Sequence, residues 1–188
     1  MGERVTVIFT AEGRVSPAVY LHSGGCPDAV YALLEELDRQ QAHQDAFFEC
    51  GRFVAIAGAL NAPGYGYVGV APGPEAITPE ALVQVQTDWG QYGFFVVHRE
   101  AGRTRVRRFV EVEAGDPAGE TGGRGGRGQG RWLRELSARE VAAERRREYT
   151  AEARDRWGRK FNAVFAVSES SHGYTQRVPY IRARVLGM

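Results

Sequence analysis

Cys26 and His22 form the most reactive pair of residue types that lie close together in this sequence. His22 precedes Cys26 by four residues, and Pro27 begins a predicted helix directly after the cysteine. A thiol at a helix N-terminus has a lowered pKa, and a nearby imidazole can act as its base. Cysteine is also among the most frequently buried residue types. Because no third group is placed to orient His22, we expect Cys26 to have no catalytic role.

The segment 64–69 matches the glycine pattern G-x-G-x-x-G of dinucleotide-binding proteins. In that fingerprint a strand precedes the glycines and a helix follows them, so that the helix N-terminus faces the pyrophosphate. Pro72 and Pro74 follow here and are incompatible with such a helix. We therefore predict no cofactor, and we interpret Tyr65 and Tyr67 as part of a packed turn or of an exposed recognition loop.

Metal-ligating and acid–base residues show no specific spacing. The four histidines and two cysteines form no paired ligand cluster of the kind that holds zinc, and no pair of carboxylates stands out. We therefore predict neither a metal site nor a catalytic residue. Cys26 and Cys50 give no disulfide framework, which favours a reduced, cytoplasmic setting.

The segment 122–131 contains six glycines and three arginines among ten residues. Ordering so many glycines is entropically expensive, so we expect residues 113–131 to form a flexible linker or loop. The segment resembles the RGG tracts of RNA-binding proteins, in which arginine contacts phosphate and stacks on bases, but it lacks their interleaved aromatic residues. A plain connector is the simpler interpretation, and Arg124 and Arg127 remain candidate partner contacts.

Charge divides the chain near this segment. Residues 1–123 carry nine basic and sixteen acidic side chains, a net charge of −7, whereas residues 124–188 carry fifteen basic and seven acidic side chains, a net charge of +8. We expect the basic part to contact an acidic or nucleoprotein surface. The candidate residues on its predicted helix are Arg139, Arg145, Arg146, Arg147, Arg154 and Arg156.

The first 112 residues predict the order strand, strand, helix, helix, strand, short helix, strand, strand. The strands are expected at 5–9, 18–21, 67–70, 94–98 and 104–110, with turns between the members of two hairpins. The helices are expected from Pro27, from Asp45 as N-cap and after Thr78 as N-cap, the first with Val30, Leu33, Leu34 and Leu37 on one face. For residues 53–60 a buried strand is an alternative.

Beyond the glycine-rich segment, Ser137 and Glu140 form a capping box at the start of a helix. This helix is expected to run to about Trp157, with Gly158 ending it. It is also expected to carry acid–base pairs four residues apart, namely Glu135–Arg139, Glu152–Arg156 and Asp155–Arg159. Residues 161–167 and 180–186 alternate as a closing pair of strands.

Together these elements predict an α+β fold, with a mostly antiparallel sheet and helices on one face. We expect residues 1–112 to form the body, residues 113–131 the linker or loop, and residues 132–188 a basic helix and β-hairpin packed on the same domain.

The end of the first predicted hairpin resembles a motif of small proteins encoded by phages, plasmids and integrative elements. The matching residues are Tyr20, His22, a glycine at 24 or 25, and Pro27. Those proteins begin with a β-hairpin that ends in Tyr-x-His-Trp-x-Gly-Tyr-Pro, followed by a helix. The resemblance covers about the first forty residues, and Ser23 and Cys26 replace its tryptophan and second tyrosine. It implies an accessory protein of a mobile genetic element that binds host machinery, including counter-defence (anti-CRISPR) inhibitors.

We expect a non-enzymatic protein that binds a host protein or a nucleoprotein complex. Direct RNA or DNA binding through the arginine-rich C-terminal part is the first alternative, and a cysteine-dependent enzyme is the second. No apolar stretch in the sequence approaches the roughly twenty residues that span a bilayer, so no membrane partner is expected.

Overall fold

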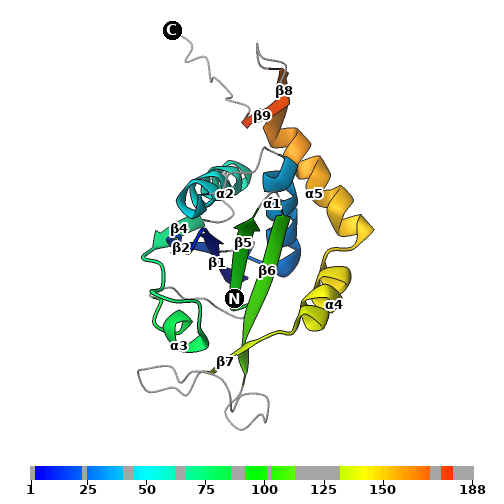
Figure 1. Ribbon diagram of the computed structural model, residues 1–188. Coiled ribbons are helices and arrows are strands. Elements are labelled where there is room, and N and C mark those ends of the chain that lie inside the picture. The colour runs from blue at the N-terminus through cyan, green and yellow to red at the C-terminus, as the bar shows by residue number, and fades with distance from the viewer. Residues whose placement is uncertain are drawn as a thin grey trace.

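The computed structural model describes residues 3–22, 25–39, 45–61, 67–85, 92–100, 103–112, 132–169 and 175–179. The elements in chain order are β1 (Arg4–Ala11), β2 (Arg14–Val15), β3 (Ala18–His22), α1 (Pro27–Arg39), α2 (Ala46–Asn61), β4 (Tyr67–Ala71), α3 (Pro79–Leu82), β5 (Phe94–Glu100), β6 (Arg103–Val112), β7 (Trp132–Glu135), α4 (Ala138–Glu148), α5 (Ala151–Val164), β8 (Phe165–Glu169) and β9 (Thr175–Pro179). The α+β class is as predicted, and so is the order of the first elements apart from the two-residue β2 (Figure 1).

The main sheet joins its strands in the order β4-β3-β1-β5-β6-β7, with β2 paired to the end of β1. β1 runs parallel to β5, and the other pairs are antiparallel. Both predicted hairpins are confirmed, since β1 pairs with β3 and β5 pairs with β6. Within the described residues, β4 and β7 are therefore the two edges of this sheet.

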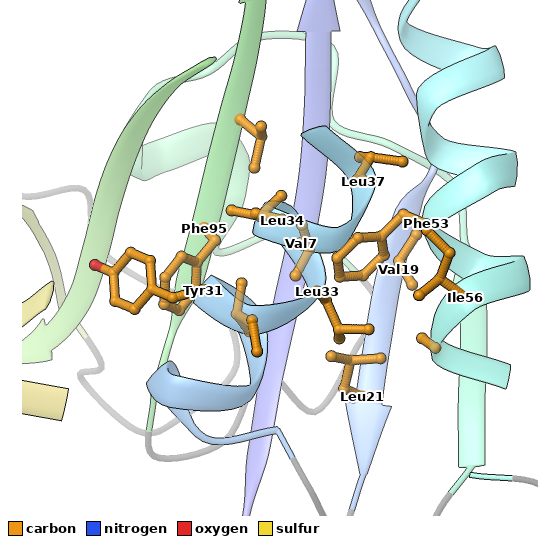
Figure 2. Packing of buried hydrophobic residues seen from close by; sticks show 14 of the residues in the cluster. Val7, Val19, Leu21, Tyr31, Leu33, Leu34, Leu37, Phe53, Ile56 and Phe95 are labelled. Atoms are coloured by element: carbon orange, nitrogen blue, oxygen red, sulfur yellow. The ribbon is translucent and has the colours of Figure 1, made fainter. Parts of the chain in front are cut away.

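The helices α1, α2, α4 and α5 cover one face of the sheet and close the main core. Figure 2 shows side chains of α1 and α2 meeting those of β1, β3 and β5 there. The apolar face predicted for α1 is buried, namely Val30, Leu33, Leu34 and Leu37. Each such side chain contributes about 1.5–3 kcal/mol relative to an exposed one, so this face holds α1 on the sheet.

The opposite face of the sheet has a smaller core under α3. Leu82 of α3 packs there with apolar side chains of β1, β5, β6 and β7. Thr78 caps α3 as predicted: its Oγ1 accepts a hydrogen bond from the backbone N–H of Ala81 at 3.3 Å, and Pro79 opens the helix. Burial on both faces explains why residues 94–97 form a continuous apolar run.

The second predicted helix is confirmed as α2, and the alternative of a strand at 53–60 is wrong. Asp45 caps this helix, since its Oδ1 accepts from the backbone N–H groups of Phe47 and Phe48, both at 2.9 Å. β7 was not predicted; it pairs with β6, so residues 132–135 belong to the main sheet.

The single helix predicted from Ser137 to Trp157 is wrong, because the chain forms α4 and α5 with a break at Tyr149 and Thr150. The Thr150 hydroxyl accepts from the backbone N–H of Ala153 at 3.2 Å and caps the new helix. Tyr149 is buried in the main core. The cap and this buried ring together fix the break.

Gly158 does not end α5, which continues to Val164. Phe161 and Phe165 are buried in the main core, and their packing outweighs the low helix propensity of glycine. The strand predicted at 161–167 consequently begins only at Phe165, as β8. It pairs with β9 in a separate two-stranded sheet. The strand predicted at 180–186 lies outside the described residues.

Candidate interaction surface on the fourth helix

The start of α4 is fixed by the predicted capping box. The Ser137 hydroxyl accepts from the backbone N–H of Glu140 at 3.3 Å, and Glu140 Oε2 accepts from the backbone N–H of Ser137 at 2.8 Å. Arg134 of β7 donates to the same carboxylate at 2.9 Å. Hydrogen bonds from the hydroxyl and backbone of Ser137, and then that from Arg134, lower the pKa of Glu140 to about 2. These hydrogen bonds therefore fix the orientation of the start of α4 relative to β7.

The inner face of α4 is anchored to the body by a buried carboxylate. Glu144 accepts from Nε and Nη2 of Arg108 at 2.9 and 3.2 Å, and from the Tyr31 hydroxyl at 2.9 Å. Arg108 also donates to the Phe94 carbonyl at 2.7 Å, and its guanidinium lies 3.8 Å from the centroid of the Phe95 ring. Burial, with the Glu144 charge beside it, raises the pKa of the Tyr31 phenol. This network fixes which face of α4 meets solvent.

The outer face of α4 carries exposed arginines. Arg139 and Arg146 lie about two helical turns apart, and residues 142–143 between them are exposed as well. Arg145 is exposed, with its guanidinium 5.6 Å from the centroid of the Tyr31 ring. In the part of the chain that the structure describes, no carboxylate pairs with these three arginines. We call Arg139, Arg145 and Arg146 the arginine face.

Arg147 lies beside this face but has a partner of its own. Its Nε donates to Glu148 at 2.8 Å, with both side chains open to solvent. An exposed pair of this kind contributes at most about 1 kcal/mol. Arg147 therefore remains accessible, but part of its charge is compensated locally.

The predicted contact residues on α5 are exposed but form ion pairs with α1. Arg154 donates to Glu35 of α1 at 3.1 Å, and Arg156 donates to Asp28 at 2.5 Å. Trp157 adds a hydrogen bond from Nε1 to the same Asp28 carboxylate at 2.9 Å. These contacts join α5 to α1, so the charges of Arg154 and Arg156 are already matched within the chain.

The structure does not place the side chains of the remaining predicted contact residues. Tyr65, Arg124 and Arg127 lie outside the described residues. Tyr67 is described through its backbone alone, as the first residue of β4. Gly69 lies inside β4, whereas the dinucleotide fingerprint places its last glycine at the start of a helix.

Cys26 does not have the lowered pKa that a position before a helix N-terminus suggested. Burial, and then a hydrogen bond to the Asp28 carboxylate, raise the pKa of its thiol to about 12. His22 lies on β3, with its Nδ1 3.2 Å from the Tyr20 hydroxyl. A thiol in this environment stays protonated at neutral pH, which weighs against the cysteine-dependent alternative.

A row of polar side chains on the sheet surface was not predicted. Thr10 Oγ1 lies 3.0 Å from His98 Nδ1, and His98 Nε2 lies 3.7 Å from Glu100 Oε2. Hydroxyl, imidazole and carboxylate are the groups of a nucleophilic triad, but 3.7 Å is too long for a hydrogen bond. The row also lies on an open strand surface, with Glu100 68% exposed. It has the geometry of a solvated sheet surface.

No group of three or more histidine, cysteine, aspartate or glutamate side chains among the described residues is arranged to hold a metal ion. None of the helices in the described part of the chain combines the length and apolar character needed to cross a bilayer. Comparison with protein-family models, with curated proteins and with solved structures found no match to this chain.

Proposed function

We propose that this protein is a non-enzymatic binding protein whose arginine face docks on an acidic surface of a host protein or nucleoprotein complex. The observation that carries the proposal is the contrast between α4 and α5. Arg154 and Arg156 are matched by carboxylates of α1, whereas the arginine face has no such partner among the described residues. Unmatched guanidinium groups on a rigidly anchored helix suit recognition of carboxylate or phosphate.

A protein surface fits better than a bare nucleic acid. Carboxylates flank the arginine face, with Glu140 and Glu148 on α4 itself and Glu152 at the start of α5. Acidic and basic groups therefore alternate around the arginine face. A protein can offer acidic and basic groups in a matching pattern, whereas a polyanionic backbone offers acidic groups alone. The resemblance at the N-terminus adds a context: a cytoplasmic accessory protein of a mobile element, with a counter-defence role against CRISPR complexes as one form.

The test is a pull-down from bacterial lysate with the intact chain and with Arg139→Glu/Arg146→Glu. The matched control is Arg103→Glu/Arg105→Glu, which makes the same charge change at two exposed arginines of β6. We expect capture of a defined partner by the wild type and the control but not by the α4 variant. Capture that survives nuclease treatment supports a protein partner, and capture abolished by nuclease supports direct nucleic-acid binding instead. Equal capture by all three proteins would remove α4 from the interface.

A further inference from the structure

β4 is an edge strand without the usual protection. It pairs with β3 on one side, and no strand among the described residues pairs with its other side. Its residues, Tyr-Val-Gly-Val-Ala, include no charged side chain and no proline, which are the features that commonly prevent an edge from pairing. Val70 at this edge is 58% exposed. The edge therefore presents backbone groups and an apolar side chain that suit another strand.

The helix beside this edge presents a second apolar surface. Phe47 and Phe48 of α2 are 52% and 53% exposed, and with Val70 they are the large exposed hydrophobic residues of the described chain. α2 lies next to β4 at one side of the molecule (Figure 1). The two charged residues of α2 are used within the fold: Glu49 accepts from Arg52 at 2.8 Å and from Arg99 of β5 at 3.0 Å. The outward side of α2 is consequently uncharged.

Two glycines on α2 have no role in internal packing. A Cβ atom added at Gly51 or at Gly58 would meet nothing within 4 Å. Glycine is the least favourable helix residue after proline, so neither the helix nor the core accounts for it at these positions. Glycine does permit close approach of another backbone.

We infer that β4 and α2 form a two-fold interface with a second copy of this chain. In this arrangement β4 pairs antiparallel with β4 of the second copy about Gly69, so that Val68 of each strand faces Val70 of the other. The sequence Val-Gly-Val is symmetric about that axis. A self-complementary patch of this kind is what a two-fold dimer requires. The interface is separate from the arginine face, and the inference does not rest on the proposed function.

The same axis brings the two α2 helices together near Gly58. Cys50 Sγ lies 3.8 Å from the Pro17 carbonyl oxygen, one residue before the partner of Ala71 in the sheet. Gly69 pairs with Tyr20, which lies three residues beyond Pro17 along β3, or about 10 Å. That distance corresponds to about six to seven residues of helix, so the axis passes close to residues 56 and 57 of α2.

Gly58 lies next to this point, so the Gly58 residues of the two copies would lie close to each other, whereas Gly51 lies further from the axis. Glycine at this position permits the two helices to approach closely.

The absence of charged side chains from the exposed described residues of this patch also supports a second copy of the chain as the partner. A two-fold axis places each nearby side chain close to its own copy, so a charge there would meet a like charge. The exposed described residues of the patch, Phe47, Phe48, Gly51, Ala55 and Val70, are all uncharged. An acidic or basic partner would call for opposite charges, and those occur on α4 and α5 instead.

The test is sedimentation of the full chain with Val70→Glu and Val70→Lys. We expect the wild type to form dimers. Each variant should raise the dimer dissociation constant at least about tenfold, because like charges then lie about 7–8 Å apart across the axis. An equimolar mixture of the two variants should recover dimers, since opposite charges now meet. Ala142→Glu and Ala142→Lys, at an exposed site on α4, are the matched controls and should dimerise as the wild type does.

A cross-linking experiment locates the axis independently. Gly69→Cys should form a disulfide-linked dimer under mild oxidation, and its new side chain has room, since the nearest atom of Tyr20 is 3.6 Å away. Ala142→Cys and the wild type, which share Cys26 and Cys50, set the background. Circular dichroism checks that each variant is folded. A monomeric wild type, a dimer unaffected by either Val70 variant, no recovery on mixing, or no cross-link at residue 69 would each overturn the inference.

Discussion

Arg108 of β6 and Glu144 of α4 form a buried ion pair across 36 residues of sequence, with Nε 2.9 Å from Oε1. Arg108 is only 1% exposed. The pair ties the sheet to the C-terminal part of the chain, and the Tyr31 hydroxyl adds α1 to the same carboxylate. The orientation of the arginine face therefore depends on a charge that is hidden from solvent.

Glu144→Gln should destabilise the protein by about 3–5 kcal/mol, because it leaves Arg108 buried without a counter-charge. Urea unfolding measures the loss. Arg108→Met/Glu144→Leu should cost clearly less than the sum of the two single changes, since no unmatched charge remains. Additive effects in this double-mutant cycle would show that the two groups are not coupled.

N-cap residues in the sequence predicted the first residues of several helices correctly. Asp45, Thr78 and Ser137 each cap a helix through hydrogen bonds to backbone groups two or three residues away. Such a cap is determined by the local sequence alone. Tyr149 shows the limit of this approach, because the break between α4 and α5 depends on a ring that is buried against distant parts of the chain.

The sequence predicted ion-pair partners only in part. Spacing predicted three pairs within one helix, and one of them, Asp155–Arg159, is confirmed. The predicted pairs Glu135–Arg139 and Glu152–Arg156 are wrong. Glu135 instead accepts from Arg107 on the neighbouring strand. Arg156 donates to Asp28, which is 128 residues away. A long guanidinium side chain pairs with whichever carboxylate the fold brings near, so the sequence could identify the basic helices but could not separate matched arginines from unmatched ones.

The capping box should make the free energy of unfolding depend on pH. The pKa of Glu140 is lowered from 4.5 to about 2 in the folded protein, so its stabilising contribution is present above pH 4.5 and is lost as the pH falls toward 2. Urea unfolding of the wild type and of Glu140→Gln should thus give a stability difference that shrinks across this window.

Carboxyl NMR titration offers a direct check. Glu140 should titrate near pH 2 in the wild type, and Ser137→Ala should raise its pKa by removing the hydroxyl that contributes most to the shift. A Glu140 midpoint at the ordinary glutamate value would contradict the observed hydrogen bonds.

Cys26 should be unreactive toward thiol reagents near neutral pH. Burial and the Asp28 carboxylate raise the pKa of its thiol to about 12, so the thiolate fraction is very small. Mass spectrometry after timed alkylation should show that Cys26 is labelled far more slowly than a cysteine in an unfolded peptide. Cys26→Ala should keep its partner binding. Loss of binding by a folded Cys26→Ala protein would restore the cysteine as a functional candidate.

Reversing Arg145, Arg146 and Arg147 to glutamate should weaken partner binding without unfolding the protein. All three side chains are exposed, and the buried anchor of α4 is Glu144, which the variant leaves intact. Because Arg145 lies over the Tyr31 ring, a small loss of stability, about 0.5–1 kcal/mol, is expected from the lost cation–π contact.

Binding should also weaken as salt rises from about 50 to 200 mM, and less steeply for the variant, since fewer charged contacts remain to be screened. Isothermal titration with the captured partner measures both effects. Arg103→Glu/Arg105→Glu, which reverses two arginines instead of three, controls for charge reversal at an exposed site away from α4. An unchanged affinity and salt dependence in the folded triple variant would move the interface from α4 to the body of the protein, with the segment around Tyr65 and Tyr67 as the next region to mutate.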